Sequence, residues 1–348
     1  MICVNISEFV TKVANPYFAL HENVSNVTNE FLRSSIEFAV KNKVFPLFYE
    51  GCLKLGIHLP KEAELLAGSY EKRRKMQLEE VNLLLDISDE LGIELMFFKT
   101  FRPFNYIPDD IDVLLRDEKD LGPLVDKLKE KGYFILKVGT PEVVLRKVGK
   151  DVYVDLDIHK RLAVGHLDVF RVENLWRNHA YETIRINNGC KMLKLSDDYE
   201  VVREAAYSLL KDFNLSIPGL YLAIYSMMNS DLKVLERIAE EENLLLPLDL
   251  YLNVAHYIAC KLFGSEARFQ LPKAKGKAAP GILLKLCKRQ QLRMPYYYPI
   301  LAITWAYMSK VELEIRRNRN VGVLLQLIKQ PSSKGMGILL DYIRECFH

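Results

Sequence analysis

Hydrophobic and polar positions change their spacing twice along the chain. Over residues 1–92 the spacing is helical, and it is clearest where Leu78, Val81 and Leu84 recur at three-residue intervals before Gly92. A glycine directly after the last apolar position is a typical helix end. The pattern therefore predicts a helical N-terminal segment.

Short apolar runs replace the helical spacing after Gly92. Residues 93–98 (IELMFF) and 111–115 (IDVLL) have the length of strands, and the loop between them contains Pro103 and Pro108. The elements expected next are a helix in 119–133, a strand in 133–138, and two strands joined by a turn at Gly149-Lys150-Asp151.

The helical spacing returns at about residue 197. A chain of 348 residues is long enough for more than one domain. We therefore expect an α+β fold, in which a small mixed sheet follows a helical segment and precedes a helical domain. The expected boundaries are 1–92, 93–195 and 196–348.

Two pairs of acidic residues interrupt the predicted strands. Asp110 and Asp112 are two residues apart in one strand, and Asp155 and Asp157 are two apart in another. Because residues i and i+2 of a strand point to one face, each pair shares a face. Carboxylates this close repel each other unless a positive charge lies between them, and a divalent cation can supply it.

A single acidic pair has a simpler explanation, in which the strand begins in solvent and Asp109 and Asp110 are turn residues. The second pair changes this interpretation. If the two strands are neighbours, up to four carboxylates gather on one sheet surface, as a two-metal phosphoryl-transfer site requires.

The order of these features resembles the nucleotidyltransferase superfamily with the DNA-polymerase-β-like core. The resemblance covers residues 78–162 and rests on LGIELMFFKTFRPFNYIPDDIDVLL, a helix, GYFIL and VDLDIHKRL. It is most similar to a branch of uncharacterised nucleotidyltransferases, which has a strand ending in Lys-Gly, then Asp-Ile-Asp-Leu-Leu, a helix, Gly-Tyr and Asp-Leu-His. The helical C-terminal half is only loosely similar.

The resemblance implies roles for the acidic residues. Asp110 and Asp112 correspond to the metal-binding pair, and Asp157 to the third metal-binding carboxylate, which helps to deprotonate the acceptor hydroxyl. Asp155 is the alternative for the third position. His159 could orient a carboxylate or touch substrate, or it is a buried, hydrogen-bonded histidine.

The implied reaction moves a nucleoside monophosphate from an NTP to a hydroxyl and releases pyrophosphate, with Mg²⁺ or Mn²⁺ as cofactor. RNA, tRNA or a protein would be the acceptor. Two alternatives are a catalytically degenerate nucleotide- or RNA-binding protein of the same fold, and a toxin-like nucleotidyltransferase of a toxin–antitoxin pair.

One departure from the family pattern concerns the nucleotide. Where the branch has Lys-Gly after the first strand, this chain has Lys99-Thr100. Glycine lets backbone N–H groups approach a phosphate closely, whereas Thr100 adds a Cβ and a methyl group. The Thr100 hydroxyl could replace a serine contact, and Lys99 and Arg102 could supply positive charge to the phosphates. These three residues are the expected nucleotide-binding set.

Charge is balanced over the whole chain but concentrated in one segment. The chain has 48 basic and 45 acidic residues, which does not by itself indicate a nucleic-acid partner. Residues 273–293, however, contain seven basic residues and no acidic one. The expected phosphate or nucleic-acid patch consists of Lys273, Lys275, Lys277, Lys285, Lys288, Arg289, Arg293, Arg316, Arg317 and Arg319.

Three consecutive tyrosines, Tyr296, Tyr297 and Tyr298, follow this segment. Aromatic faces can stack on unpaired bases, which would extend the patch. The alternative is a solvated helix face with the tyrosines in the core.

Cysteine usage and hydropathy indicate the compartment. The six cysteines are scattered without a Cys-x-x-Cys pair, and His159 and His166 have no third ligand nearby, so neither set predicts a zinc site. No segment reaches the about 18 apolar residues of a membrane helix, and the first residues do not resemble a signal peptide. We expect a cytoplasmic protein without a membrane partner; the pattern indicates no oligomeric state.

Overall fold

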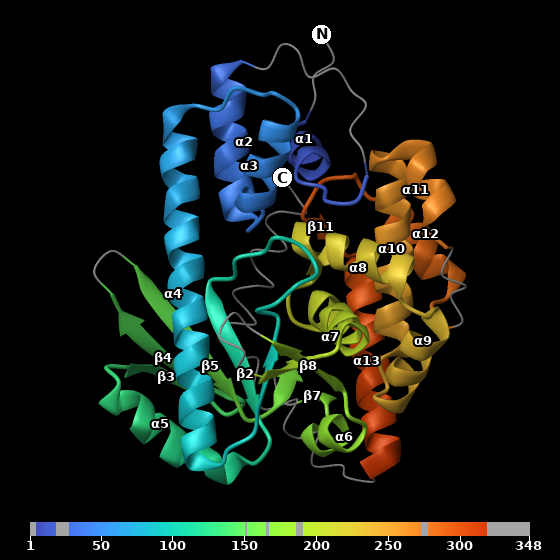
Figure 1. Cartoon of the computed structure of the whole chain (residues 1–348). Coiled ribbons are helices and arrows are strands. Elements are labelled where there is room, and N and C mark those ends of the chain that lie inside the picture. The colour runs from blue at the N-terminus through green and yellow to red at the C-terminus, as the bar shows by residue number, and fades with distance from the viewer. Residues whose placement is uncertain are drawn as a thin grey trace. The chain divides into compact units, whose positions relative to one another are not determined.

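The computed structural model describes residues 5–18, 28–149, 152–164, 167–185, 191–272 and 278–318 (Figure 1). The chain forms two compact units. The helical unit comprises Met1–His21, Val164–Val169 and Val201–His348, and the sheet unit comprises Glu22–Ala163 and Phe170–Glu200. The predicted α+β fold is confirmed, because a seven-stranded mixed sheet accompanies the helices.

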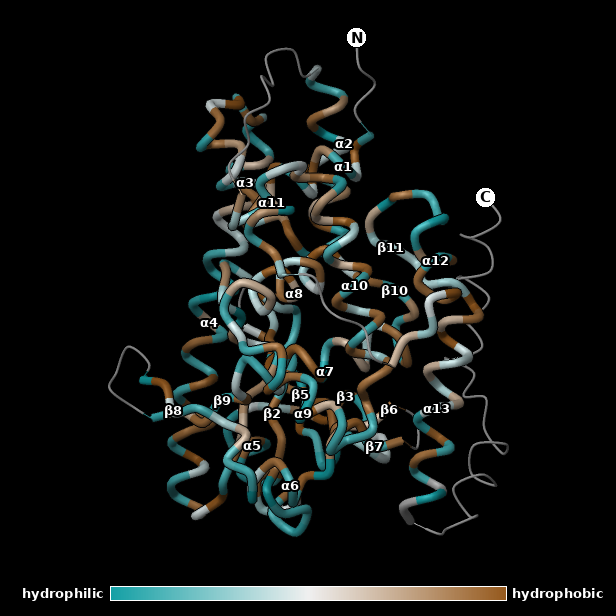
Figure 2. The backbone as a smooth tube through the Cα atoms, turned by 90° about the vertical axis from the view of Figure 1, so that its right-hand side faces the viewer, coloured by the Kyte–Doolittle hydropathy of each residue, from teal (hydrophilic) through white to brown (hydrophobic). Residues whose placement is uncertain are grey.

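The longest helix of the sheet unit is α4 (Lys61–Leu91). The residue that caps its C-terminal end is Gly92, which has a positive φ of 66°. This left-handed position suits glycine and confirms the predicted helix end. Along α4 the tube alternates between hydrophilic and hydrophobic residues (Figure 2). The other helices are α2 (Asn29–Lys41), α3 (Phe45–Lys54), the 3₁₀ helix η1 (Glu118–Asp120), α5 (Leu121–Glu130) and α6 (Val172–Arg177).

The seven-stranded sheet has the order β3-β4-β5-β2-β1-β9-β8. Its β2–β5 and β1–β9 pairs are parallel, and the remaining pairs are antiparallel. Two of these strands, β8 and β9, are not among the predicted ones. The strands are β1 (Leu95–Phe98), β2 (Asp110–Leu115), β3 (Phe134–Val138), β4 (Glu142–Val148), β5 (Tyr153–His159), β8 (Tyr181–Arg185) and β9 (Lys191–Leu195).

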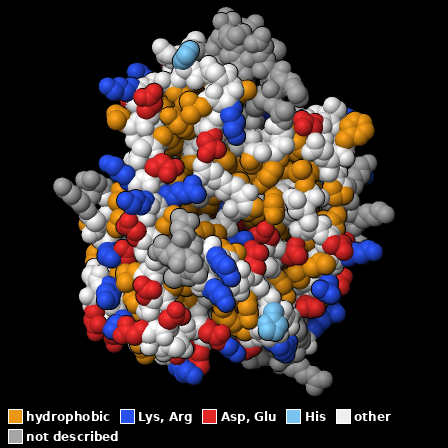
Figure 3. All heavy atoms as spheres, viewed as in Figure 1, with side chains coloured by type: hydrophobic (Ala, Val, Ile, Leu, Met, Phe, Trp, Pro, Cys, Tyr) orange, Lys and Arg blue, Asp and Glu red, His pale blue; other side chains and the backbone are white. Residues whose placement is uncertain are grey.

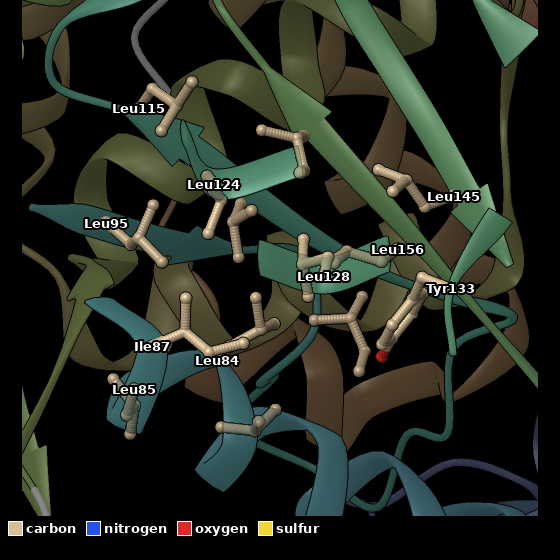
Figure 4. Packing of buried hydrophobic residues seen from close by; sticks show 14 of the residues in the cluster. Leu84, Leu85, Ile87, Leu95, Leu115, Leu124, Leu128, Tyr133, Leu145 and Leu156 are labelled. Atoms are coloured by element: carbon tan, nitrogen blue, oxygen red, sulfur yellow. The ribbon is translucent and has the colours of Figure 1, made fainter. Parts of the chain in front are cut away.

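One face of the sheet forms the core of its unit. Leu84 and Ile87 of α4 and Leu124 and Leu128 of α5 pack against this face (Figure 4). The sheet contributes side chains that alternate along β2 and β5, and burying one apolar side chain of this size contributes about 1.5–3 kcal/mol. These buried strand residues include Ile111, Val113, Val154, Leu156 and Ile158. Because successive residues alternate, the acidic residues of both strands point to the opposite face.

The helical unit is built from apolar helices, and hydrophobic residues recur along α8 and α10 (Figure 2). Buried tyrosines connect its segments: the hydroxyl of Tyr221 donates to the carbonyl of Thr11 at 2.7 Å. The elements are α1 (Ile6–Val13), α8 (Ile217–Asn229), α9 (Leu232–Glu241), α10 (Leu245–Leu262), α11 (Gly264–Gln270), α12 (Gly281–Arg289), α13 (Ile300–Asn318), β10 (Asn214–Leu215) and β11 (Tyr296–Tyr297). The chain passes between the units through β6 (Leu162–Val164), β7 (Leu167–Phe170) and α7 (Asp197–Leu210).

Within the described ranges, every helix is too short or too polar to cross a lipid bilayer. On the face of the molecule drawn in Figure 3, acidic and basic side chains are interspersed. This mixture agrees with the small net charge of +3.

Candidate metal centre

The two acidic pairs lie on neighbouring strands in matching register. Asp110 is the partner of Asp155, and Asp112 is the partner of Asp157, in the parallel β2–β5 pair. Neighbouring strands are about 4.8 Å apart, so all four carboxylates share one sheet face. This acidic face is opposite the core face. The structure thus brings the two predicted pairs together.

Three side chains converge at the centre of this face. Potential ligand atoms of Asp112, Asp157 and His159 all lie within 4.8 Å of one another, and among the described residues this is the group able to hold a metal ion. Asp112 and His159 are buried, and Nε2 of His159 lies 3.0 Å from Oδ1 of Asp112. The sequence did not identify this group, because Asp112 reaches His159 only through the pairing of β2 with β5.

Asp110 lies outside this three-residue group, at the first and partly exposed position of β2. Burial raises the pKa of Asp110, and the Asp112 carboxylate adds to the rise, whereas Lys99 and Lys43 oppose it. Asp110 therefore interacts electrostatically with Asp112, and it lies beside the three-residue group on the same sheet face. The neighbouring Asp109 contacts other cations: Lys43 at 2.7 Å and Arg73 at 3.2 Å.

The structure distinguishes the two rival acids of β5. Asp155 accepts two hydrogen bonds from Arg146, from Nε and from an Nη, both 2.7 Å long. Its charge is thereby neutralised by a paired guanidinium. Asp157 instead belongs to the three-residue group. Sequence reasoning did not identify Arg146, although its position in the alternating strand 142–148 places it on the acidic face.

Lys99 occupies a tight turn beside Asp112. Its φ is +58°, and the amide of Thr100 donates to the carbonyl of Phe98 at 2.6 Å, which closes a three-residue turn. The turn directs Nζ of Lys99 to both oxygens of Asp112, at 3.0 and 3.2 Å. The lysine that was predicted to contact phosphate therefore contacts the candidate metal-binding group directly.

Thr100 has a structural role that glycine could not provide. Its side-chain Oγ1 accepts a hydrogen bond from the amide of Asp112 at 3.1 Å and donates to the carbonyl of Phe98 at 3.2 Å. Thr100 is buried, so its hydroxyl fixes the start of β2 against the end of β1. Thr100, which stands where the resemblance led us to expect glycine, thus positions the backbone of Asp112.

The pKa values of Asp112 and Asp157 shift in opposite directions. Burial acts to raise the pKa of Asp112, but Lys99 and His159 outweigh it, and the pKa lies well below its usual value. Burial, together with Asp110, Asp112 and Glu142, raises the pKa of Asp157 to about 7. Asp112 is thus a permanent anion, whereas Asp157 exchanges its proton near neutral pH.

Arg102 lines a small cavity of about 120 Å³ between α4 and the loop before β2. Its guanidinium lies 4.7 Å from the ring centroid of Tyr106. Thr100 lines the same cavity, and Gln77 of α4 anchors its rim by donating to the carbonyl of Pro108 at 2.8 Å. Small-molecule pockets usually measure about 300–1,000 Å³, so this cavity fits a small group and not a whole nucleotide.

The predicted basic patch is described only in part. Lys285, Lys288, Arg289 and Arg293 are exposed on or after α12. Arg316 is exposed and pairs with Glu312. Predicted patch members outside the described residues or side chains are Lys273, Lys275, Lys277, Arg317 and Arg319.

The tyrosines after this segment do not extend the patch. Tyr296 and Tyr298 are buried in the helical unit, and the hydroxyl of Tyr296 donates to the carbonyl of Cys287 at 2.6 Å. Their proposed stacking on bases is therefore wrong, and the alternative of core tyrosines is confirmed for these two.

Comparison with known proteins adds no relative: no family model matches the chain, and no curated protein sequence matches it. The functional argument therefore rests on the geometry of the acidic face.

Proposed function

We propose that the chain is a metal-dependent nucleotidyltransferase that moves a nucleoside monophosphate from an NTP to a hydroxyl. The observation that carries this proposal is the register of β2 and β5, which places Asp112 directly beside Asp157 and Asp110 directly beside Asp155. Arg146 offsets the charge of Asp155 and Lys99 that of Asp112, but Asp110 and Asp112 still add to burial in raising the pKa of Asp157, and a cation would relieve this repulsion.

Asp112, Asp157 and His159 would hold the cation, with Asp110 beside them. Two carboxylates and an imidazole suit Mn²⁺, whereas Mg²⁺ prefers oxygen ligands alone and would use Asp110 in place of His159. When bound, the cation supplies charge that polarises a phosphoryl oxygen and steadies the attacking and leaving oxygens.

Asp157 is the proposed general base. Without a cation the pKa of Asp157 is about 7, and a bound cation would take the place of its proton, so that the carboxylate would be charged in the loaded site. In its charged form this carboxylate would accept the proton of the acceptor hydroxyl. Asp112 stays ionised and keeps its binding role. The different proton affinities of the two acids thus support different roles in one site.

Lys99 is the proposed contact of the triphosphate. Its ammonium group already lies at the edge of the acidic face, within 3.2 Å of both oxygens of Asp112. A cation that binds Asp112 would release this ammonium group for phosphate oxygens, which are strong acceptors of charge-assisted hydrogen bonds. Arg102 would support a phosphate from the adjacent small cavity.

One observation favours a second candidate, a nucleotide-binding protein without catalysis. Thr100 directs its hydroxyl to the amide of Asp112 and to the carbonyl of Phe98. The hydroxyl is thereby committed to the fold, and the loop lacks the glycine that would let a phosphate approach its backbone.

Incubation of the full chain with each labelled NTP, Mn²⁺ or Mg²⁺, and total cellular RNA or protein tests the proposal. A labelled macromolecule that depends on metal supports transfer. The Asp112→Asn variant should form none, and Asp117→Asn, which alters an acid paired with Lys119 in the same unit, should retain the activity. Metal and NTP binding without any labelled product would favour the second candidate.

A further inference from the structure

His159 lies between two carboxylates, which approach different nitrogens of its ring. Nε2 lies 3.0 Å from Oδ1 of Asp112, and Nδ1 lies 3.7 Å from Oε2 of Glu142. The three residues come from neighbouring strands, because Glu142 is the partner of His159 in the β4–β5 pair and β5 is paired with β2. The imidazole therefore has one nitrogen at the candidate metal centre and the other beside a carboxylate that is not in the three-residue group.

Glu142 divides its two oxygens between two neighbours. Its Oε1 accepts a hydrogen bond of 2.6 Å from Nζ of Lys137 on the edge strand β3, while Oε2 is the oxygen nearest to His159. The Glu142 side chain is 19% exposed. The pairing with Lys137 thus restrains this carboxylate beside the imidazole.

Packing fixes the ring of His159 as well. The residue is 5% exposed, and the buried ring of Phe98 contacts it edge-on, with the ring centroids 4.9 Å apart and the planes at 70°. The orientation that presents Nε2 to Asp112 is therefore set by the fold, and it requires no cation.

A cation can use Nε2 only through its lone pair, so the ring hydrogen must then reside on Nδ1. Asp112 is ionised and can only accept, so without a cation the hydrogen resides on Nε2. Ligating histidines in proteins donate from the second nitrogen to a carboxylate, a carbonyl or water, which fixes the tautomer and makes the ligating nitrogen more basic. Glu142 is placed to accept this hydrogen from Nδ1.

The resulting donor set favours one class of cation. Mg²⁺ takes oxygen ligands, whereas first-row transition-metal ions also bind imidazole well. A set made only of oxygens would need Asp110, which lies outside the group of Asp112, Asp157 and His159. An imidazole supported by a carboxylate therefore raises the affinity for a transition-metal ion more than the affinity for Mg²⁺.

We propose that Glu142 is a positioning residue that makes His159 a metal ligand, and that the centre thereby selects a first-row transition-metal ion over Mg²⁺. This inference rests on the proposed function and names the class of its cofactor. Glu142 acts through the imidazole and does not itself contact the cation.

Calorimetric titrations of the full chain with Mn²⁺ alone and with Mg²⁺ alone test the selectivity, without NTP or acceptor. We expect Mn²⁺ to bind about tenfold or more tightly than Mg²⁺. Glu142→Gln should weaken Mn²⁺ binding about tenfold or more, the loss typical of a missing supporting carboxylate. Loss of one negative charge weakens the binding of both ions, so the excess loss for Mn²⁺ measures the positioning.

Two further variants separate charge from position. Glu142→Asp keeps the charge but shortens the side chain, so it should weaken Mn²⁺ binding and leave Mg²⁺ binding unchanged. Glu118→Gln removes a carboxylate that pairs with Lys160, the residue after His159, and should bind both ions like the wild type. Thermal unfolding of each variant shows that a loss of affinity is not a loss of fold.

Electron spin echo spectroscopy of bound Mn²⁺ supplies a signature that a structural defect does not imitate. Modulation from a directly coordinated imidazole nitrogen should appear in the wild type and disappear in His159→Gln. Absence of this modulation in the wild type overturns the proposal, as do equal losses of Mn²⁺ and Mg²⁺ affinity in Glu142→Gln.

The same measurements distinguish this inference from the proposed function. Mn²⁺ selectivity that depends on Glu142, without any NMP transfer, would refute the proposed function and keep the role of Glu142. NMP transfer that Mg²⁺ supports as well as Mn²⁺, and that His159→Gln retains, would do the reverse.

Discussion

Arg146 donates two hydrogen bonds of 2.7 Å to Asp155, and this pairing distinguishes Asp155 from its neighbour Asp157. The two carboxylates are two residues apart on β5 and share a face, yet only Asp157 lies within 4.8 Å of the other potential metal ligands. We therefore expect Asp157→Asn to abolish Mn²⁺ binding in calorimetric titrations, because the group loses one of its two anionic ligands.

Asp155→Asn is the paired control for this prediction. It should leave Mn²⁺ affinity within a factor of a few and lower the free energy of unfolding by about 1 kcal/mol, since it breaks a partly exposed ion pair. Loss of Mn²⁺ binding in Asp155→Asn with retention in Asp157→Asn would reverse the assignment.

The pKa of Asp157 makes the stability of the metal-free protein depend on pH. In the folded chain this pKa is about 7, above its usual value of 3.8, so the folded state binds the proton more tightly than the unfolded state. The resulting stabilisation is fully present below pH 3.8 and is lost as pH rises through 7. Asp157→Asn should remove this part of the pH dependence.

Thermal unfolding of the wild type and of Asp157→Asn between pH 5 and pH 8 checks this prediction. The difference in Tm should favour the variant more strongly at the higher pH. A constant difference over this range would show that Asp157 titrates at its usual pKa. Adding Mn²⁺ at pH 8 should stabilise the wild type, because metal binding replaces the proton.

Thr100→Val should destabilise the fold at the start of β2. The substitution keeps the size of the side chain but leaves the buried amide of Asp112 without its acceptor at 3.1 Å. An unsatisfied buried donor costs about 1–3 kcal/mol. Urea denaturation measures this loss, and Thr100→Ser, which retains the hydroxyl, should lose much less. Equal stability of the valine and serine variants would contradict the role of the hydroxyl.

Lys99→Met should change metal and nucleotide affinity in opposite directions. Without the ammonium group 3.0 Å from Asp112, a divalent cation no longer competes with an internal one, so Mn²⁺ should bind more tightly. The triphosphate should bind about tenfold or more weakly, because a charge-assisted contact contributes about 1.5–3 kcal/mol. Titrations with Mn²⁺ and with Mn²⁺ plus a non-hydrolysable NTP separate the effects. Unchanged affinities for both would place Lys99 outside the site.

Local sequence patterns predicted the elements that position the site. The three-residue apolar spacing and Gly92 define the end of α4, and the alternation along β2 places its acids opposite Ile111 and Val113. Strand β9 was not predicted, because its two buried residues, Met192 and Leu195, do not alternate, and strand β8 was not predicted, because none of its side chains is buried.

Contacts across the sheet could not be predicted in the same way. His159 reaches Asp112 only because β5 is parallel to β2, and Arg146 reaches Asp155 only through the antiparallel register of β4 and β5. A shift of one residue in either pairing would turn these side chains to the core face. Spacing along one strand contains no information about such registers.

The parallel pairing of β2 and β5 also determines when the metal centre can form. His159 and Asp112 are 47 residues apart in sequence, and the chain between them must close a long loop before they meet. Closing such a loop costs entropy, and proteins rich in non-local contacts fold more slowly. A nascent or truncated chain that ends before β5 would possess Asp110 and Asp112 but no metal centre. We therefore expect Mn²⁺ binding to require the paired strands β2 and β5.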